Sequence, residues 1–517
     1  MKRKFLKTSI FSLSFFSVST FVVQAFPIDY IAGKDRYETA ALISERLDYS
    51  TAILVNGLSL VDGLSASGLS GCLNAPILLT EPNSIPLSTL NRIKNTSTIY
   101  LVGGYGVIST EIESQLKNQG KTIIRLGGKD RFSTSYLVAD EIDKRTGINE
   151  LYYVNGLIGE ADAMSIAPVA AKNGNPIILT DGKSTNYTRT VKSYAIGGLG
   201  VLNSFFDSFA ERLNGQNRFE TNNNVINRFF PNKTHINLSK SEELIDALTA
   251  SALKDPVVLL DINSDKSVIG GAKSATVFGD INQLAINRAK SYLFNDTVVF
   301  YSQHQDDETL FAGSAIVDAI KAVGAKNVYV VLISDGDESG VFNDYRYNNL
   351  SLEKKTALRN TEFRAATSQL GVLEKNLIFL NQPEKNINEN VIKDIIIDFE
   401  NRFSNVTHVT HSYKYDFHEQ HLKTGNILYN LYKSNQIKDC RFFGRKELMP
   451  TINNRMLIES ISDNKNEKDN ILKACFEYKL DKADMVREGI GYKSVSSLFD
   501  NLISDPLNIS YLHEPGL

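Results

Sequence analysis

YIAGKDRYETA, at residues 30–40, recurs 95 residues later as RLGGKDRFSTS, at residues 125–135. Self-similarity at a fixed spacing is typical of proteins built from repeated structural units. The two stretches therefore predict tandem units of one fold. Three more blocks repeat in the same order: VNGL at Val55 and Val154, NAPILLT at Asn74 against NPIILT at Asn175, and YLVGGYGVIS at Tyr100 against YAIGGLGVLN at Tyr194.

A third, more divergent unit follows. DPVVLLD, from Asp255, resembles the proline-containing block, and ATVFGD, from Ala275, resembles the double-glycine block. We expect this unit to have lost the GKDR block. In the first unit, ETAALISERL has apolar residues at helical spacing, whereas AILVNG and TIYLVGG are short β-branched runs typical of buried parallel strands. The sequence thus predicts three small α/β units in tandem.

The pairs Asp35-Arg36 and Asp130-Arg131 stand at the same place in the first two units. They could bind a ligand. Alternatively, the aspartate begins a helix as its N-cap and the arginine forms a structural ion pair. The sequence favours the structural role for each residue taken singly.

The GKDRYETA, VNGL, PILLT and VGG blocks together resemble the type 2 cell-wall-binding repeat of clostridial surface proteins, over roughly residues 27–294. The resemblance implies three Rossmann-like repeats that pack as an intramolecular trimer. It also implies a non-covalent anchor that holds an anionic secondary cell-wall polymer. Arg36 and Arg131 are the residues that we expect to contact this polymer.

The first 25 residues resemble a secretory signal peptide. Lys2, Arg3, Lys4 and Lys7 precede an apolar stretch, and small residues surround a cleavage site after Ala25. The alternative is an uncleaved membrane anchor. Cleavage removes four basic residues and no acidic one, which changes the net charge from −3 to −7. No later stretch is apolar for long enough to span a bilayer, so we expect no membrane association after cleavage.

The charge balance and the cysteines exclude several classes of protein. The chain has 56 Lys and Arg residues against 59 Asp and Glu, which gives no sign of nucleic acid binding. Its three cysteines are scattered and lack CxxC spacing. A disulfide scaffold and a cysteine-ligated zinc site are therefore not expected.

Six of the seven histidines lie beyond residue 300. The segment TVVFYSQHQDDETLFAG, from residue 297, begins as a buried strand and continues into a helical pattern. His304, Asp306, Asp307 and Glu308 therefore lie on the loop at the carboxyl edge of the predicted sheet, where α/β proteins bind ligands. These groups cannot all be buried without partners, and a divalent metal would explain them.

A second histidine motif follows another strand pattern. VTHVTHS precedes YDFHEQH, in which His418 and His421 stand three residues apart and so lie on one side of a turn or helix. Each motif alone has a structural explanation, a helix cap for the first and a solvated turn for the second. Two such motifs, each placed after a strand, favour a shared metal site.

The two motifs resemble the signature of the PIG-L, or LmbE-like, family of zinc-dependent N-acetylglucosaminyl deacetylases, over roughly residues 296–430. The resemblance implies a Rossmann-like domain in which His304, Asp307 and His421 bind Zn²⁺ or another divalent metal. It implies that Asp306 is the general base that activates a zinc-bound water. His418 would stabilise the oxyanion or act as an acid.

Arg359-x-x-Glu362 resembles a further block of this family and implies that Arg359 contacts substrate. An ion pair within the helix is the structural alternative. Two positions depart from the family pattern: Gln305 replaces the commoner proline, and Glu419-Gln420 replaces Pro-Asp. We expect these departures to affect the rigidity of the loops and the orientation of the ligands more than metal binding itself.

The sequence therefore predicts an α/β chain that acts as a cell-surface hydrolase of a Gram-positive bacterium, anchored to the wall and removing N-acetyl groups from an N-acetylglucosamine-type sugar. Two alternatives stay open, a surface-layer structural or binding protein with a non-catalytic domain and a hydrolase of another acyl group. Residues 440–517 carry no motif with a clear meaning. The predicted organisation is a signal peptide at 1–25, cell-wall-binding repeats at 26–119, 120–214 and 215–294, and a deacetylase domain at 295–517.

Overall fold

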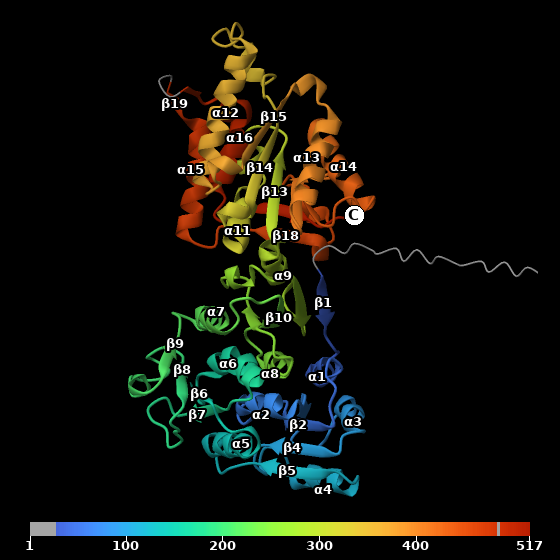
Figure 1. Ribbon diagram of the computed structural model, residues 1–517, viewed down its shortest axis with the longest axis vertical. Coiled ribbons are helices and arrows are strands. Elements are labelled where there is room, and N and C mark those ends of the chain that lie inside the picture. Colours follow the sequence, from blue (N-terminus) through green and yellow to red (C-terminus); the bar gives the residue numbers. More distant parts are fainter. Residues whose placement is uncertain (1–26, 483–485, 517) are drawn as a thin grey trace, which may run out of the picture.

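The computed structural model describes residues 27–482 and 486–516, so the predicted signal peptide lies outside the described residues. The chain forms two parts that follow one another along the long axis of the molecule (Figure 1). The N-terminal part contains three four-stranded sheets, and the C-terminal part contains one seven-stranded sheet. The α/β class predicted from the sequence is confirmed.

The three small sheets share one design, in which all neighbouring strands are parallel. The first has the order β3-β2-β4-β5, with β2 at Thr51–Asn56, β3 at Ile77–Thr80, β4 at Thr98–Val102 and β5 at Thr122–Leu126. The second has the order β7-β6-β8-β9, with β6 at Glu150–Asn155, β7 at Ile177–Thr180, β8 at Lys192–Ile196 and β9 at Glu211–Leu213. The third has the order β1-β12-β10-β11, with β1 at Ile28–Ile31, β10 at His235–Lys240, β11 at Val257–Leu260 and β12 at Ser274–Phe278.

The third sheet is completed by the first strand of the described chain. In the first two units, the edge strand β5 or β9 directly precedes the next GKDR-type block. The third unit takes β1 instead, which pairs with β12 from Ile28↔Ala275 to Ile31↔Phe278. The N-terminal region is therefore a closed ring of three units, since its first strand belongs to its last sheet.

The GKDR block turns the chain from each edge strand into a helix. Asp35 and Asp130 are the N-caps of α1 (Arg36–Ser44) and α5 (Arg131–Thr146), and the side chain of each accepts a backbone hydrogen bond, as the helix-start prediction requires. Asn217 caps α7 (Arg218–Phe229) in the same way. Gly215-Gln216-Asn217-Arg218 is thus the third copy of the block, and the expectation that it was lost is wrong. Asparagine caps a helix as well as aspartate does, so Asn217 keeps the capping role although the residue type has changed.

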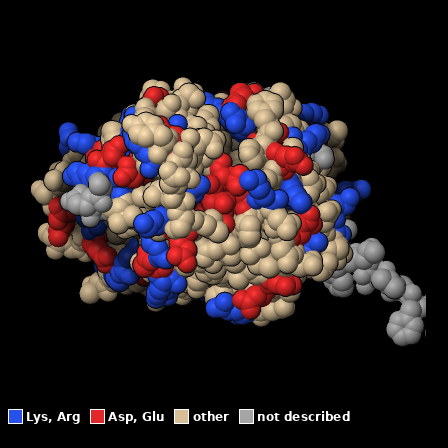
Figure 2. Space-filling model, turned by 90° about the horizontal axis from the view of Figure 1, so that it is seen from above, with Lys and Arg blue, Asp and Glu red and all other residues tan. Residues whose placement is uncertain are grey.

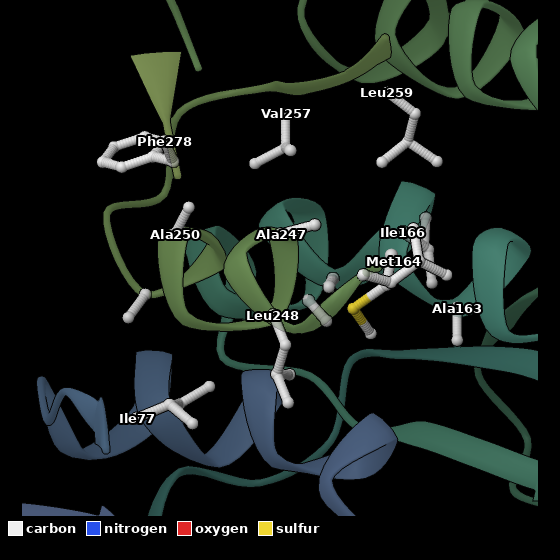
Figure 3. Packing of buried hydrophobic residues seen from close by; sticks show 14 of the residues in the cluster. Ile77, Ala163, Met164, Ile166, Ala247, Leu248, Ala250, Val257, Leu259 and Phe278 are labelled. Atoms are coloured by element: carbon white, nitrogen blue, oxygen red, sulfur yellow. The ribbon is translucent and has the colours of Figure 1, made fainter. Parts of the chain in front are cut away.

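Three helices, one from each unit, pack together at the centre of the ring. They are α2 (Ala66–Leu73), α6 (Glu160–Asn173) and α8 (Ile245–Ser251), and their side chains meet the strands in one continuous core (Figure 3). Gly71 permits the closest approach, since a Cβ there would lie 1.8 Å from the carbonyl oxygen of Ala171. The other helices of the ring are α3 (Leu87–Ile93), α4 (Thr110–Asn118) and α9 (Gln283–Ala289).

The C-terminal sheet has the order β15-β14-β13-β16-β17-β21-β18. Its first five strands are parallel, whereas β21 runs antiparallel to both of its neighbours. After β13, the chain adds β14 and β15 on one side and then returns to place β16 on the other. The strands are β13 (Thr297–Ser302), β14 (Val328–Ser334), β15 (Leu377–Gln382), β16 (Val406–His411), β17 (Cys440–Phe443), β18 (Leu457–Ser460) and β21 (Ser510–His513).

Helices cover both faces of this sheet (Figure 1). One apolar core lies beneath α11, α12, α15 and α16, and a second lies beneath α13 and α14. A short hairpin of β19 (Asp481–Lys482) and β20 (Arg487–Glu488) precedes α16. The helices are α10 (Asp307–Leu310), α11 (Gly313–Val323), α12 (Leu352–Gln369), α13 (Glu389–Arg402), α14 (Glu419–Lys433), α15 (Lys465–Lys479) and α16 (Ile490–Ser504).

The two parts of the molecule meet through buried polar contacts. The guanidinium of Arg441 on β17 is buried and donates to the backbone carbonyls of Lys290 and Leu293, at the end of the ring. Arg288 on α9 lies 3.6 Å from the carboxylate of Glu459 on β18. Because β13 starts beside this junction, its carboxyl end points away from the ring.

Across residues 27–482 and 486–516, no helix has both the length and the apolar character that crossing a bilayer requires.

Candidate active site

The two histidine motifs meet at the point where the strand order of the C-terminal sheet reverses. His304 and Asp306 lie on the loop after β13, and His411 ends β16, which pairs directly with β13 and leads into the loop that carries His418. Ligands of open α/β sheets bind at the carboxyl ends of the strands beside such a reversal. Figure 2, which views the molecule from this end, shows Asp and Glu side chains gathered near the middle of the face.

One carboxylate oxygen stands at the centre of the site. Oδ2 of Asp307 lies 3.3 Å from Nδ1 of His304, from Nε2 of His421 and from Nε2 of His411. Nδ1 of His304 and Nε2 of His421 are themselves 3.1 Å apart. Four groups, from the loop after β13, the start of α10, the end of β16 and the first turn of α14, therefore converge on one small volume.

The outer nitrogens of two of these imidazoles are held by acceptors. Nε2 of His304 lies 2.8 Å from Oε1 of Gln420 and 3.4 Å from Oε1 of Glu384. Nδ1 of His421 lies 3.0 Å from Oδ2 of Asp416. Since a carboxylate or amide oxygen can only accept, each outer nitrogen carries the hydrogen. The inner nitrogens, Nδ1 of His304 and Nε2 of His421, are thus the atoms directed at the common centre.

The surroundings of the site favour a positive charge at this centre. Burial disfavours the imidazolium of His304, but the carboxylates of Asp307 and Glu384 outweigh burial and raise its pKa to about 10. Burial also acts on Asp307, but the neighbouring imidazoles of His421 and His411 hold its pKa well below the ordinary value. A divalent cation could replace the protons that satisfy this charge balance. Two imidazoles and one carboxylate are a donor set that suits zinc.

Asp306 occupies a strained position beside this centre. Its backbone has φ 114° and ψ −30°, a conformation that non-glycine residues rarely adopt and that is held here by its surroundings. Its N–H donates to the Glu308 carboxylate at 3.1 Å, and its Oδ2 accepts from Arg359 at 3.0 Å. Burial raises the pKa of Asp306 to about 6, although the charge of Arg359 opposes the shift.

His418 lies at the mouth of the site as the N-cap residue of α14. Its side-chain nitrogen is within 4.8 Å of nitrogens of both His304 and His421. It is exposed, unlike the buried His421 three residues later. Although the residue is exposed, the atoms around its ring partly desolvate it, and this desolvation together with the nearby His421 lowers the pKa of His418, so the neutral ring predominates near pH 7.

A cavity of about 220 Å³ opens above these residues. Asp306, Asp307, His304, His418 and His421 line this cavity. Its walls come from several loops and helices: Leu310, Phe311, Gly336, Ser339, Gly340, Arg359, Glu384, Arg445, Ser494, Val495 and Leu498.

Known protein families match both the N-terminal ring and the C-terminal domain. The family described as "Cell wall binding domain 2 (CWB2)" matches three times, at residues 30–113, 125–205 and 212–300. The family described as "GlcNAc-PI de-N-acetylase", or PIG-L, matches residues 299–432. The chain carries three CWB2 repeats followed by a PIG-L domain.

The chain also resembles individual proteins over part of their length. It is 27% identical over 316 residues to the N-acetylmuramoyl-L-alanine amidase LytC of Bacillus subtilis, a match that covers 56% of the chain and 63% of LytC. It is 30% identical to the solved structure of Cwp8 from Clostridium difficile, with a TM-score of 0.47, covering 52% of the chain and 51% of Cwp8. It is 13% identical to the N,N'-diacetylchitobiose deacetylase of Pyrococcus horikoshii, with a TM-score of 0.31, covering 43% of the chain and 82% of that structure.

The structure brings the predicted residues of the PIG-L domain together. His304, Asp307 and His421 surround the centre, and Asp306 and His418 line the same cavity. Their individual roles stay predictions. Arg359 also lines the cavity, but its Nη2 is bonded to Asp306 and to the carbonyl of Gln305, so the ion pair with Glu362, at 3.7 Å, is only part of its environment. A direct contact between Arg359 and substrate remains a prediction.

Several residues of the site were missed by the sequence analysis. His411 is the last residue of β16, and its position at the carboxyl edge of a strand was the available signal. Asp416 stands within the YDFHEQH segment, but its contact with His421 depends on how the loop turns. Glu384 lies in the turn that follows β15, and sequence spacing alone could not place it near His304.

The two departures from the family pattern make specific contacts. Gln420 joins His304 to the loop after β15, because its Nε2 donates to the carbonyl of Glu384 at 2.8 Å while its Oε1 faces the imidazole. Gln305 donates to the side chain of Asn360 at 2.9 Å. Gln420 thus connects α14 to the loop after β15, and Gln305 connects the loop after β13 to α12, while the effect of the two departures on loop rigidity stays a prediction.

In the CWB2 repeats, the three equivalent arginines have one structural task. Arg36, Arg131 and Arg218 donate through Nη1 to the carbonyl oxygens of Gly57, Gly156 and Ser241, respectively. Each contact joins the start of a helix to the residue that follows a strand of the same repeat. Nη2 of Arg36 also lies 3.8 Å from the carboxylate of Glu243, as the structural alternative of an ion pair requires. The predicted contact of Arg36 and Arg131 with polymer stays a prediction.

Proposed function

We propose that this protein is a wall-anchored, metal-dependent N-deacetylase that acts on an N-acetylated amino sugar. The observation that carries the proposal is the convergence of His304, His421 and Asp307 on one centre, with Asp306 beside it in the same cavity. The match to the GlcNAc-PI de-N-acetylase family supports the same chemistry.

His304, Asp307 and His421 would hold the metal, which we propose is zinc. When bound, zinc supplies a Lewis acid that polarises a carbonyl and lowers the pKa of water towards about 7. The contacts of His304 with Glu384 and Gln420 and of His421 with Asp416 fix the rings so that their inner nitrogens face the centre. Contacts of this kind orient the ligands and increase their basicity.

Asp306 is the proposed general base. Its carboxylate lines the cavity, is held by Arg359, and has a pKa of about 6, so it is ionised near pH 7 yet basic enough to take a proton from water. The same carboxyl can then give the proton to the leaving amine. The backbone strain at Asp306 is consistent with a side chain that the fold holds in one working orientation.

His418 is the proposed partner of the carbonyl oxygen. It is exposed and lines the cavity beside the rings of His304 and His421. Because the neutral ring predominates near pH 7, it would act by donating its N–H to the oxygen on which negative charge develops. Protonation of His418 is not needed for this role.

The CWB2 repeats are the proposed anchor, and a cell-surface location in a Gram-positive bacterium follows from them. We propose that they hold an anionic wall polymer through exposed parts of basic side chains at the junctions between units, among them Arg36 and Arg131. LytC, which shares sequence with this chain, is named as an N-acetylmuramoyl-L-alanine amidase, so wall material is a natural place to look for the substrate.

The test is the release of acetate and the appearance of free amines in purified wall glycans. We expect both with the full chain, their loss after treatment with a metal chelator, and their return when Zn²⁺ is added back. If the protein binds stoichiometric zinc but releases acetate from no N-acetylated sugar, the non-catalytic binding module is the better description. If O-acetyl esters alone are cleaved, the reaction is an ester hydrolysis.

A further inference from the structure

A second cavity, of about 460 Å³, adjoins the catalytic one. The two share three wall residues, Leu310, Phe311 and Leu498, so they form one elongated depression along the carboxyl edge of the sheet. The catalytic cavity alone, at about 220 Å³, is smaller than the roughly 300–1,000 Å³ typical of small-molecule sites. A ligand held only there would leave much of its surface in water.

Helix α16 runs along both cavities. Ser494 and Val495 line the catalytic one, and Asn501, Leu502 and Ser504 line the second. Val495 has φ −142° and ψ 45°, so the helix bends where it passes from one cavity to the other. The bend sets the later turns of α16 along the second cavity. One element thus shapes a continuous site.

The second cavity has both apolar and polar lining residues. Leu310, Phe311, Leu502 and Ile509 supply an apolar floor, and the ring of Tyr511 closes one side. Polar groups stand at the rim: Lys446, Glu447, Asn501, Ser504 and Asp505. An acyl chain would be expected to need apolar walls throughout. A pyranose ring instead presents an apolar C–H face and hydroxyls at its edge, which this arrangement matches.

The charges of the rim argue against an anionic ligand. Lys446 donates to Asp505 at 2.7 Å, and Glu447 pairs with Arg445 at 2.7 Å. Asp505 also accepts the backbone N–H of Leu507, so its carboxylate is fixed in place. The basic groups are therefore matched by acidic ones, and no net positive charge is left for a phosphate or a carboxylate. Neutral hydroxyls are the groups that such a paired rim can bind.

We propose that the second cavity binds the sugar residue next to the one that is deacetylated, so that the preferred substrate is a glycan chain rather than a monosaccharide. This inference rests on the proposed deacetylase function. The cavity is built mainly from residues 444–447 and 498–511, outside the matched PIG-L region at 299–432. The C-terminal segment, which carries no motif, thus acquires a role in substrate choice.

The experiment compares deacetylation of N-acetylglucosamine with that of its β-1,4-linked dimer and tetramer by the zinc-loaded full chain. We expect kcat/KM to be at least about tenfold higher for the oligomers, the effect of one or two net hydrogen bonds plus apolar contact. Asn501→Trp, which fills the cavity from an exposed position, should remove most of this preference. It should leave the rate with the monosaccharide unchanged.

Lys446→Ala should lower the preference in part, because it removes a donor from the rim. Lys479→Ala is the matched control, since Lys479 makes a similar ion pair with Asp500 on α16, at 2.9 Å, but does not line the cavity. Equal kcat/KM for monomer and tetramer, unaffected by Asn501→Trp, would overturn the proposal.

Binding of the tetramer, measured by calorimetry, separates this inference from the proposed function. If no substrate is hydrolysed but the tetramer binds and Asn501→Trp weakens that binding, the deacetylase function fails and the sugar subsite stands. If the tetramer neither binds nor reacts while the monosaccharide is deacetylated, the subsite fails and the deacetylase function stands. If none of these sugars binds or reacts, the subsite is rejected as well.

Discussion

Asp306 and Asp307 are neighbours with the same side chain, yet their contacts differ completely. Asp307 faces three imidazole nitrogens, whereas Asp306 faces Arg359. We therefore expect Asp306→Asn to keep bound zinc and lose at least about 100-fold in kcat, the low end of a general-base contribution. Asp307→Asn should instead lose most of its zinc, with activity partly restored by excess metal. Metal analysis and acetate release measure the two effects, and zinc loss confined to Asp306→Asn would reverse the assignment.

The pairing of Asp306 with Arg359 predicts the acidic limb of the pH profile. A base works only when ionised, so activity should fall as the pH drops through about 6, the pKa of Asp306. Burial raises this pKa and the charge of Arg359 restrains it. In Arg359→Met the pKa should rise further, and the loss of activity should begin at a higher pH. Arg364→Met is the control, since Arg364 on the same helix pairs with Glu374 away from the site. An acidic limb that does not move in Arg359→Met would contradict the pairing.

The site residues that belong to sequence motifs could be predicted from the sequence, whereas those that only the fold brings to the site could not. His304, Asp306 and Asp307 stand together in the chain, so their shared location was readable without a structure. Glu384 lies near His304 because β15, which precedes Glu384, pairs with β14 in the sheet. The spacing of residues along the sequence does not predict this strand pairing. The strain at Asp306 was equally invisible, since nothing in a run of acidic residues shows a positive φ.

At the scale of elements, the repeated blocks predicted the small α/β units but not how the ring closes. Parallel strands with β-branched residues are local patterns, so AILVNG and TIYLVGG were recognisable as β2 and β4. The pairing of β1 with β12 spans nearly the whole N-terminal part and becomes visible only in three dimensions. The third GKDR-type block was not recognised because its residues differ from GKDR at two positions. The fold requires only a helix-capping side chain followed by an arginine, and Asn217 and Arg218 supply these.

Substitution of Asn222 on α7 tests how much a buried side chain of the third unit contributes to the stability of the ring. Its side chain is fully buried, donates to the carbonyl of Val257 at 3.0 Å and to Ser165 at 3.2 Å, and accepts from the N–H of Leu259 at 3.0 Å. Asn222→Ala leaves these groups unpaired and should cost about 2–4 kcal/mol. A fall of about 5 °C or more in the unfolding temperature of the ring is expected.

The control for this prediction lies two residues away on the same helix. Asn224 is exposed, and its side chain makes a single hydrogen bond to the carbonyl of Asn214, at 2.8 Å. Asn224→Ala should change the unfolding temperature little, since water can replace that partner. Equal and small effects of the two substitutions would mean that the third unit is loosely packed.

At the scale of the whole molecule, the two parts share a junction, and we propose separate tasks for them. Arg441 is buried between them and bonds to backbone carbonyls of the ring, so a cut near residue 294 would expose a guanidinium and its acceptors together. The intact chain is therefore the better subject for separating anchoring from catalysis. The proposed metal centre lies at the carboxyl end of β13, a strand that points away from the ring (Figure 1).

This separation predicts that chelation and salt act on different functions of the intact chain. A chelator should abolish acetate release while the protein stays on washed cell walls, because the CWB2 repeats use no residue of the metal site. High salt should release the protein from the walls, since exposed charge contacts are screened over a Debye length of about 3 Å at 1 M. The released protein should still deacetylate soluble oligosaccharides. Pelleting of the walls and acetate assays of both fractions measure the two effects. Release by chelator alone would place wall binding in the PIG-L domain, and retention at high salt would show that anchoring does not depend on exposed charges.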